Sequence, residues 1–278
     1  MTGNINFDGL LKGGKDEEEI GPVWTIQNAS YSGKSFDVGS QEGFPAGLSF
    51  NSTGTRMFMT GFFSSSVHQY NLTTAFDITS ASFSTSFDVS SEIGSPQDLT
   101  FNDDGTRMFV PGSSSVYQYN LDAAFDLSSP VTFSGNSFDV SSQDTSPTSV
   151  TFNSTGTFMF VAGNMTDKIY QYNLGTAFDV STASFSNKSF DVSSEETFPE
   201  GVRFGTTGTR MFMIGVNGAT VYEYNLGAAF DISTASFSGV SFDVSGQDGA
   251  PTALTFKDDG TLMFVVGSQT DSVYQYNL

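Results

Sequence analysis

The sequence predicts an all-β protein, a five-bladed β-propeller of four-stranded antiparallel blades. Two repeated signatures support this fold. The turn core Gly-Thr-Xaa-Met-Phe occurs five times, at 54–58, 105–109, 156–160, 208–212 and 260–264. Ser-Phe-Asp-Val begins at Ser35, Ser86, Ser137, Ser189 and Ser241. A period of about 50 residues that contains only short strand-like runs is typical of a propeller.

The second repeat illustrates the four strands expected in each blade. Residues 99–101 form a first strand, and Asn102-Asp-Asp-Gly105 makes a tight turn, because glycine accepts positive φ and Asn and Asp tolerate it. The second strand, 107–110, has consecutive apolar side chains, so both of its faces should be buried between blades. The third strand covers 116–121, and a connector leads to a fourth strand around 133–140.

The phenylalanines recur with the blades. Five positions of the repeat hold a phenylalanine in nearly every copy. The first phenylalanine at each position is Phe50, Phe58, Phe76, Phe83 and Phe36. Large rings at one radius of every blade predict packing between blades. Methionines recur in the second strand and are expected in the same core, at Met57, Met108, Met159, Met211 and Met263.

The two ends of the chain predict how the ring closes. The sequence ends with the third strand of the fifth blade, which therefore lacks its own outer strand. Trp24 and Tyr31 are spaced like Phe76 and Phe83, so residues 24–38 match a connector and a fourth strand. We expect this N-terminal strand to complete the C-terminal blade, because closure removes exposed sheet edges.

Residues 1–22 contribute no repeat element and are interpreted as an N-terminal arm, which leaves 23–278 as the propeller. A tail without a task is the alternative. Four apolar side chains in the arm are expected to anchor it to a partner protein, namely Ile5, Phe7, Leu10 and Leu11.

Composition narrows the possible partners. The formal net charge is −20, from 30 acidic residues against 10 Lys and Arg, so nucleic acid and anionic membrane surfaces are not expected partners. Cysteine is absent, and no apolar run is long enough to insert into a membrane. No secretory signal is visible. A virion protein, assembled in the host cytoplasm and released by lysis, fits these features; a mature secreted or cell-surface chain is the alternative.

The repeat resembles known propeller blades. Phe-Xaa-Xaa-Asp-Gly-Thr-Xaa-Met-Phe-Val-Xaa-Gly, followed by Val-Tyr-Gln-Tyr-Asn-Leu, is similar to repeats of the lactonase-like, YVTN-type superfamily. It resembles more closely the repeats, of about 50 residues, in structural and surface proteins of bacteriophages, especially marine ones. The resemblance covers residues 24–278 and implies blades of this type. It implies no catalytic residue, because such blades serve enzymes, lectins and scaffolds alike.

The loops suggest two kinds of binding residue. We expect the loops that precede the first strand and those that follow the second to share one face. Four carboxylates there, Glu42, Asp144, Glu196 and Asp248, predict an acidic ring at the channel mouth that would bind a cation or a basic partner. The alternative is that they cap loop amides. Non-repeating aromatics on this face could stack on a sugar or anchor a protein, unless they only pack locally: Phe44, Phe62, Phe63 and Phe198.

Catalytic residues are not expected. Asp98 and Glu200 are non-repeated carboxylates near first strands, but a glycosidase acid–base pair made from them has no evident third partner. His68 takes a position held elsewhere by tyrosine and is interpreted as structural. Asn102-Asp-Asp-Gly and Lys257-Asp-Asp-Gly resemble calcium loops but lack the distal glutamate, so hairpin turns are expected. We expect no metal and no cofactor.

These observations favour a non-enzymatic virion structural or attachment protein, on a phage tail or capsid surface. It would bind other virion proteins and, through the loops, a host-surface glycan or receptor. A carbohydrate-binding lectin is the alternative, and a glycosidase or lactonase-like enzyme is the third possibility.

Overall fold

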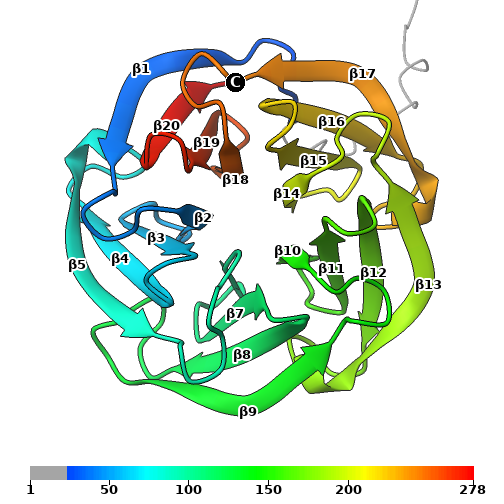
Figure 1. Ribbon diagram of the computed structural model, residues 1–278, viewed down its shortest axis with the longest axis horizontal. Helices are drawn as coiled ribbons and strands as arrows, with labels where there is room; N and C mark the ends of the chain where they lie inside the picture. Colours follow the sequence, from blue (N-terminus) through cyan, green and yellow to red (C-terminus); the bar gives the residue numbers. More distant parts are fainter. Residues whose placement is uncertain (1–23) are drawn as a thin grey trace, which may run out of the picture.

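The computed structural model describes residues 24–278, and these form five four-stranded antiparallel blades around a central axis (Figure 1). The predicted propeller is confirmed. No helix among these residues is both long and apolar enough to cross a membrane. Residues 1–23 lie outside the described part of the chain, so the anchoring role expected for the arm remains a prediction.

The strands follow one another in the order that the repeats predict. The first blade contains β2 (Pro45–Phe50), β3 (Arg56–Gly61), β4 (Ser66–Leu72) and β5 (Ala81–Asp88). The second contains β6 (Thr100–Phe101), β7 (Arg107–Gly112), β8 (Ser115–Leu121) and β9 (Val131–Asp139). The third contains β10 (Pro147–Phe152), β11 (Phe158–Gly163), β12 (Lys168–Leu174) and β13 (Ala183–Asp191). The fourth contains β14 (Pro199–Phe204), β15 (Arg210–Gly215), β16 (Thr220–Leu226) and β17 (Ala235–Asp243). The fifth contains β18 (Pro251–Phe256), β19 (Leu262–Gly267), β20 (Ser272–Asn277) and, on its outside, β1 (Ser30–Asp37).

Short 3-10 helices occur in three connectors, η1 (Ile78–Ser80), η2 (Val180–Thr182) and η3 (Ile232–Thr234). An aspartate precedes each helix and caps its first turn. The Asp77 carboxylate, for example, accepts a hydrogen bond from the Thr79 amide. Such a cap satisfies an amide that the helix itself leaves unpaired.

The ring closes as predicted. Tyr31 of β1 pairs with Tyr276 of β20, just as Phe83 pairs with Tyr70 within the first blade. Trp24 packs against the turn glycine Gly260, where a Cβ would come within 2.4 Å of the indole. Gly260 has a φ of 70°, so glycine is needed there both for the backbone and for the close approach.

The core lies between neighbouring blades. All five second strands are buried along almost their whole length, as their consecutive apolar residues predict. Phe36 of β1 contacts Tyr70 of the next blade edge to face, with ring centroids 5.4 Å apart. The prediction was wrong for the Phe83 position, because Phe83 is 46% exposed and packs on tyrosine within its own blade. The tyrosine that precedes the Asn-Leu end of each third strand is fully buried, at Tyr70, Tyr119, Tyr172, Tyr224 and Tyr276.

The first strand of the second blade is shorter than its equivalents. Pro111 in β7 stands where β3 has Thr60, and proline has no amide to donate to the neighbouring strand. The Leu99 amide, like the equivalent amide of Val150, faces the axis and donates to the Asp98 carboxylate, at 2.8 Å. Asp98 is thereby held at the axis, ahead of β6.

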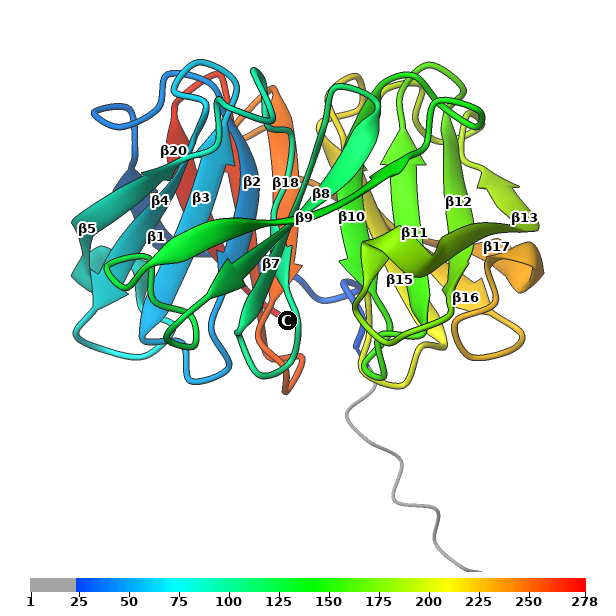
Figure 2. The same cartoon turned by 90° about the horizontal axis from the view of Figure 1, so that it is seen from below.

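The two faces of the ring differ, as Figure 2 shows from the side. The tight turns lie on the lower face, together with the end of the chain; the Leu278 amide bonds the Thr261 carbonyl in one of these turns. The loops before the first strands and after the second strands share the other face. The Phe62 amide, for example, bonds the Phe44 carbonyl at 3.0 Å. This arrangement confirms the expected division.

Candidate functional site

The four predicted loop carboxylates are 2% exposed, and each binds loop amides. The Glu42 oxygens accept from the amides of Phe44, Phe63 and Ser64 at 2.8–3.1 Å. Glu196 accepts from the amide of Gly218 at 2.9 Å and from that of Phe198 at 2.8 Å.

Asp144 and Asp248 also accept hydrogen bonds from loop amides, in the third and fifth blades. Asp144 accepts from the Ser146 amide and from the amide and hydroxyl of Thr166, at 2.6–3.0 Å. Asp248 accepts from the Ala250 amide and from Thr270 in the same way. The capping alternative is therefore confirmed for these four side chains. They do not form an exposed acidic ring, because buried loop amides need acceptors and these carboxylates are turned inward to supply them.

Three exposed phenylalanines gather on the loop-bearing face of the first blade; we call Phe44, Phe62 and Phe63 the phenylalanine cluster. They are 37%, 42% and 69% exposed. Their ring centroids lie 5.8–5.9 Å apart in edge-to-face contacts. Phe198 is 39% exposed at the equivalent of Phe44 in the fourth blade, and makes no ring contact with the cluster. The sequence predicted the common face, and the structure shows that three of the four aromatics meet.

His68 supports the loop that carries the cluster. It is buried, and its Nε2 lies 2.9 Å from the Ser64 hydroxyl. Burial lowers the pKa of this imidazole, while the nearby Glu42 charge opposes the shift. Its burial and its contact within its own blade agree with the structural interpretation of His68.

A buried ion pair occupies the axis. The Asp98 oxygens accept from the two terminal guanidinium nitrogens of Arg203 at 2.9 and 3.0 Å. One of these oxygens also accepts from the Ser149 hydroxyl at 2.7 Å and the Val150 amide at 3.1 Å. The pair thus joins the first strands of three blades. Sequence reasoning missed Arg203, although it is the only charged residue at a position that is otherwise Ser49, Thr100, Thr151 and Thr255.

Glu200 lies in β14 and is 8% exposed. Burial raises the pKa of its carboxyl to about 8, and the charges of Asp98 and Glu196 contribute in the same direction. Glu200 is therefore protonated at neutral pH. The two non-repeated carboxylates thus differ in their surroundings: Asp98 is paired with Arg203, and Glu200 is buried without a cationic partner among the described residues.

We expect Glu200→Gln to stabilise the protein in alkali but not in acid. The folded-state pKa is raised, so the folded carboxyl holds its proton where the unfolded one loses it, and stability falls as pH rises from about 4.5 towards 8. The neutral amide does not titrate, so the gain should be on the order of 3–5 kcal/mol near pH 9 and close to zero near pH 4. Urea unfolding at the two pH values measures it. An equal gain in the free energy of unfolding at both pH values would contradict the raised pKa of Glu200.

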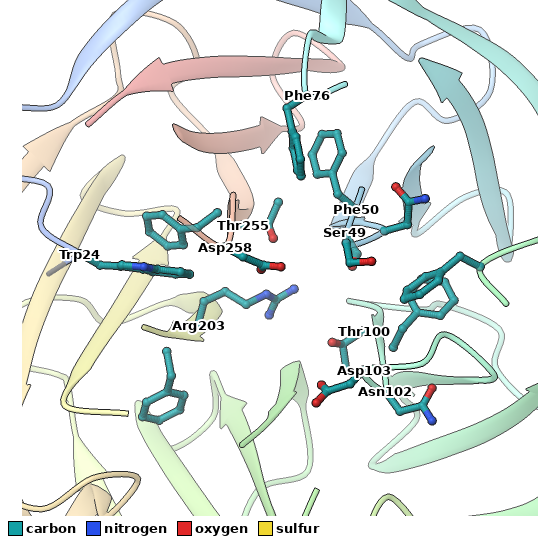
Figure 3. Close-up of a pocket in the computed structure, with 16 residues that line it drawn as sticks. Trp24, Ser49, Phe50, Phe76, Thr100, Asn102, Asp103, Arg203, Thr255 and Asp258 are labelled. Carbon is teal, nitrogen blue, oxygen red and sulfur yellow. The ribbon is translucent and has the colours of Figure 1, made fainter. Parts of the chain in front are cut away.

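A pocket of about 400 Å³ opens around the axis on the face of the tight turns (Figure 3). Phe50, Phe101 and Trp24 are among its aromatic lining residues. Arg203 points towards the middle of the pocket, with Asp258 above it and Asp103 below and to the right in this view. Within residues 24–278, no three His, Asp or Glu side chains are grouped so that they could hold a metal ion.

Comparisons with known proteins support the fold. No protein-family model matches the chain, and no curated protein matches it. A functionally unknown protein from Desulfotomaculum acetoxidans is similar in structure, with a TM-score of 0.50 and 15% identity over 80% of this chain and 65% of that one. A protein from Bacteroides fragilis described as a "putative 6-phosphogluconolactonase" has a TM-score of 0.50 and 13% identity, over 80% of this chain and 64% of that one. The chain thus spans less than two thirds of either structure, and at these identities the likeness concerns the fold alone.

Proposed function

We propose that the protein is a non-enzymatic virion structural or attachment component that binds a partner protein through the phenylalanine cluster. The observation that carries this proposal is the exposure of three contacting aromatic rings on the loop-bearing face. Exposed rings of this kind are typical of interface hot spots. Fully burying one phenylalanine is worth roughly 1.5–3 kcal/mol, so a partner that covers the cluster could obtain much of its affinity there.

The fold does not require these rings. Phe62 and Phe63 correspond to Ser268 and Gln269 in the fifth blade, where the loop keeps the same backbone hydrogen bond. Phe44 corresponds to Ala250 there. Because small and polar residues form the same loop, folding alone does not explain the aromatic residues of the first blade.

A protein partner fits the cluster better than a sugar does. Sugar recognition combines an aromatic face with polar side chains that bind hydroxyl groups. Glu42, the carboxylate within these loops, is 2% exposed and already accepts three amides. The three rings also meet edge to face, which leaves an irregular apolar surface and no single flat platform.

The axial carboxylates favour a role without catalysis. Both oxygens of Asp98 bind Arg203, so this side chain is not free to act as a base beside Glu200. The virion setting is supported by the resemblance of the repeats to phage propellers. The arm residues Ile5, Phe7, Leu10 and Leu11 would supply a second contact with the particle.

We expect purified particles of the phage that encodes this chain to contain the protein. A tagged copy with Phe62→Ser and Phe63→Gln, the residues of the fifth blade, should be incorporated at least about tenfold less than the wild type. Phe198→Ala is the matched control, since it removes an equally exposed ring from another blade, and it should be incorporated normally. Mass spectrometry of purified particles measures the incorporated amounts of the wild type, the double variant and the control.

Absence of the protein from particles would overturn the proposal, as would normal incorporation of the double variant. Saturable binding to a glycan array that depends on Phe62 and Phe63 would replace it with the lectin function.

A further inference from the structure

We infer that the axial pocket binds a small organic ammonium ion, with its charge between Asp103 and Asp258 and its carbon chain against the aromatic wall. This inference is independent of the docking surface proposed above, because the pocket opens on the opposite face of the ring. Its volume, about 400 Å³, lies within the range of small-molecule sites.

The charges around the pocket do not cancel. Arg203 lines it, but both terminal nitrogens of its guanidinium are paired with Asp98. Lys257 at the same mouth is paired with Asp259 at 2.6 Å. Asp103 and Asp258 also line the pocket, and neither makes a side-chain hydrogen bond or ion pair within residues 24–278. Two negative charges therefore remain without a partner.

The surroundings of both carboxylates disfavour negative charge. Partial removal from water raises the pKa of Asp103, and the charges of Asp258 and Asp104 raise it further. The pKa of Asp258 is raised by partial burial and by the charge of Asp259. A bound cation would relieve this repulsion.

The turns do not need Asp103 and Asp258. In the other three blades the same position holds Ser52, Ser154 or Thr206, and the turn keeps its backbone hydrogen bonds. The residue that follows this position, in contrast, has a role in the turn. Asp104 accepts from the amide and hydroxyl of Thr106, so this carboxylate caps the turn. Asp259 does the same for Thr261. Each acidic turn thus has one structural carboxylate and one that faces the pocket.

The walls favour an organic cation over a metal ion. Phe50, Phe101 and Phe256 end three first strands there, and aromatic faces attract ammonium groups. The Lys257 ammonium already lies 5.6 Å from the centre of the Phe76 ring at this mouth. Calcium sites combine several carboxylates with other oxygen ligands, and within residues 24–278 no three acidic or histidine side chains are grouped to hold a metal ion.

Trp24 is the sole tryptophan of the chain, so its fluorescence reports directly on this pocket. We expect 1,4-diaminobutane to change the emission of the full-length protein saturably, and the uncharged 1,4-butanediol to leave it unchanged. Replacing Asp103 and Asp258 together with serine, the residue at Ser52, should weaken binding about tenfold or more, because charge-assisted contacts are lost.

The matched control is Asp88→Ser with Asp139→Ser, which removes the same net charge from exposed positions on the opposite, loop-bearing face of the ring. It should bind 1,4-diaminobutane within about twofold of the wild type. Binding should also weaken in mild acid, because the pKa values of Asp103 and Asp258 are raised while those of Asp104 and Asp259 are lowered, so Asp103 and Asp258 protonate first. The other charged groups around the pocket are Arg203, paired with Asp98, and Lys257, paired with Asp259.

No saturable signal with the diamine would overturn the inference. The inference would also be overturned if the two double variants bound 1,4-diaminobutane with equal affinity. It would be overturned as well if calcium chloride changed the tryptophan emission as much as the diamine does.

Discussion

Deleting residues 24–37, which end in β1, should open the ring and lower the free energy of unfolding on the order of 5 kcal/mol or more. The segment buries Trp24 and Ile26 between the fourth and fifth blades and supplies the outer strand of the fifth. Loss of two large buried side chains alone costs several kcal/mol. Urea unfolding followed by circular dichroism measures the effect.

The same deletion leaves the edge of β20 unpaired, so we also expect self-association, seen by analytical ultracentrifugation. Removing residues 1–22 is the control, and it should change the unfolding free energy by less than about 1 kcal/mol. A chain that lacks 24–37 but unfolds at the wild-type urea midpoint would show that β1 does not close the ring.

The substitution with the largest expected effect is Arg203→Thr, which introduces the residue found at Thr100, Thr151 and Thr255. The Asp98 carboxylate, 1% exposed, would then lose the guanidinium that pairs with it. Removing one partner of a buried ion pair typically costs about 3–5 kcal/mol, because the remaining charge is uncompensated.

The double variant Asp98→Ser with Arg203→Thr should recover most of that stability. Both substitutions then match other blades, where Ser149 and the threonines occupy these positions. Replacing both partners of a buried pair is often close to neutral. Guanidinium unfolding of the two single variants and the double variant forms a double-mutant cycle. Additive losses would mean that Asp98 and Arg203 are not coupled.

The fold could be predicted because every blade repeats the same pattern of strand and turn residues. Phe58, Met57 and Gly54 have equivalents in all repeats, and each occupies the same place in the structure. The strand that closes the ring was predictable for the same reason, since the spacing of Trp24 and Tyr31 matches a connector and a fourth strand. Repetition tells less about which face of a strand is covered, and Phe83 is half exposed because it lies on the outermost strand.

The candidate sites were only partly predictable, because they are made by exceptions to the repeat. The phenylalanine cluster was found, since its three rings break the pattern within one blade. The Asp98–Arg203 pair was missed, because it joins residues 105 positions apart in the sequence. Asp103 and Asp258 were interpreted only as turn residues, because sequence alone does not show that two separate turns face one cavity.

The pairing of β1 with β20 also affects the order in which the protein can fold during synthesis. Ser30 leaves the ribosome long before its partner Asn277 exists. The four blades made of consecutive strands can form while the chain grows, but β1 must wait until almost the whole propeller has been made. Long-range contacts of this kind slow folding, because a large loop has to close before they form. We therefore expect the ring to be sealed in the last step of folding, and until then both β1 and the edge of β20 are open to pairing with another copy.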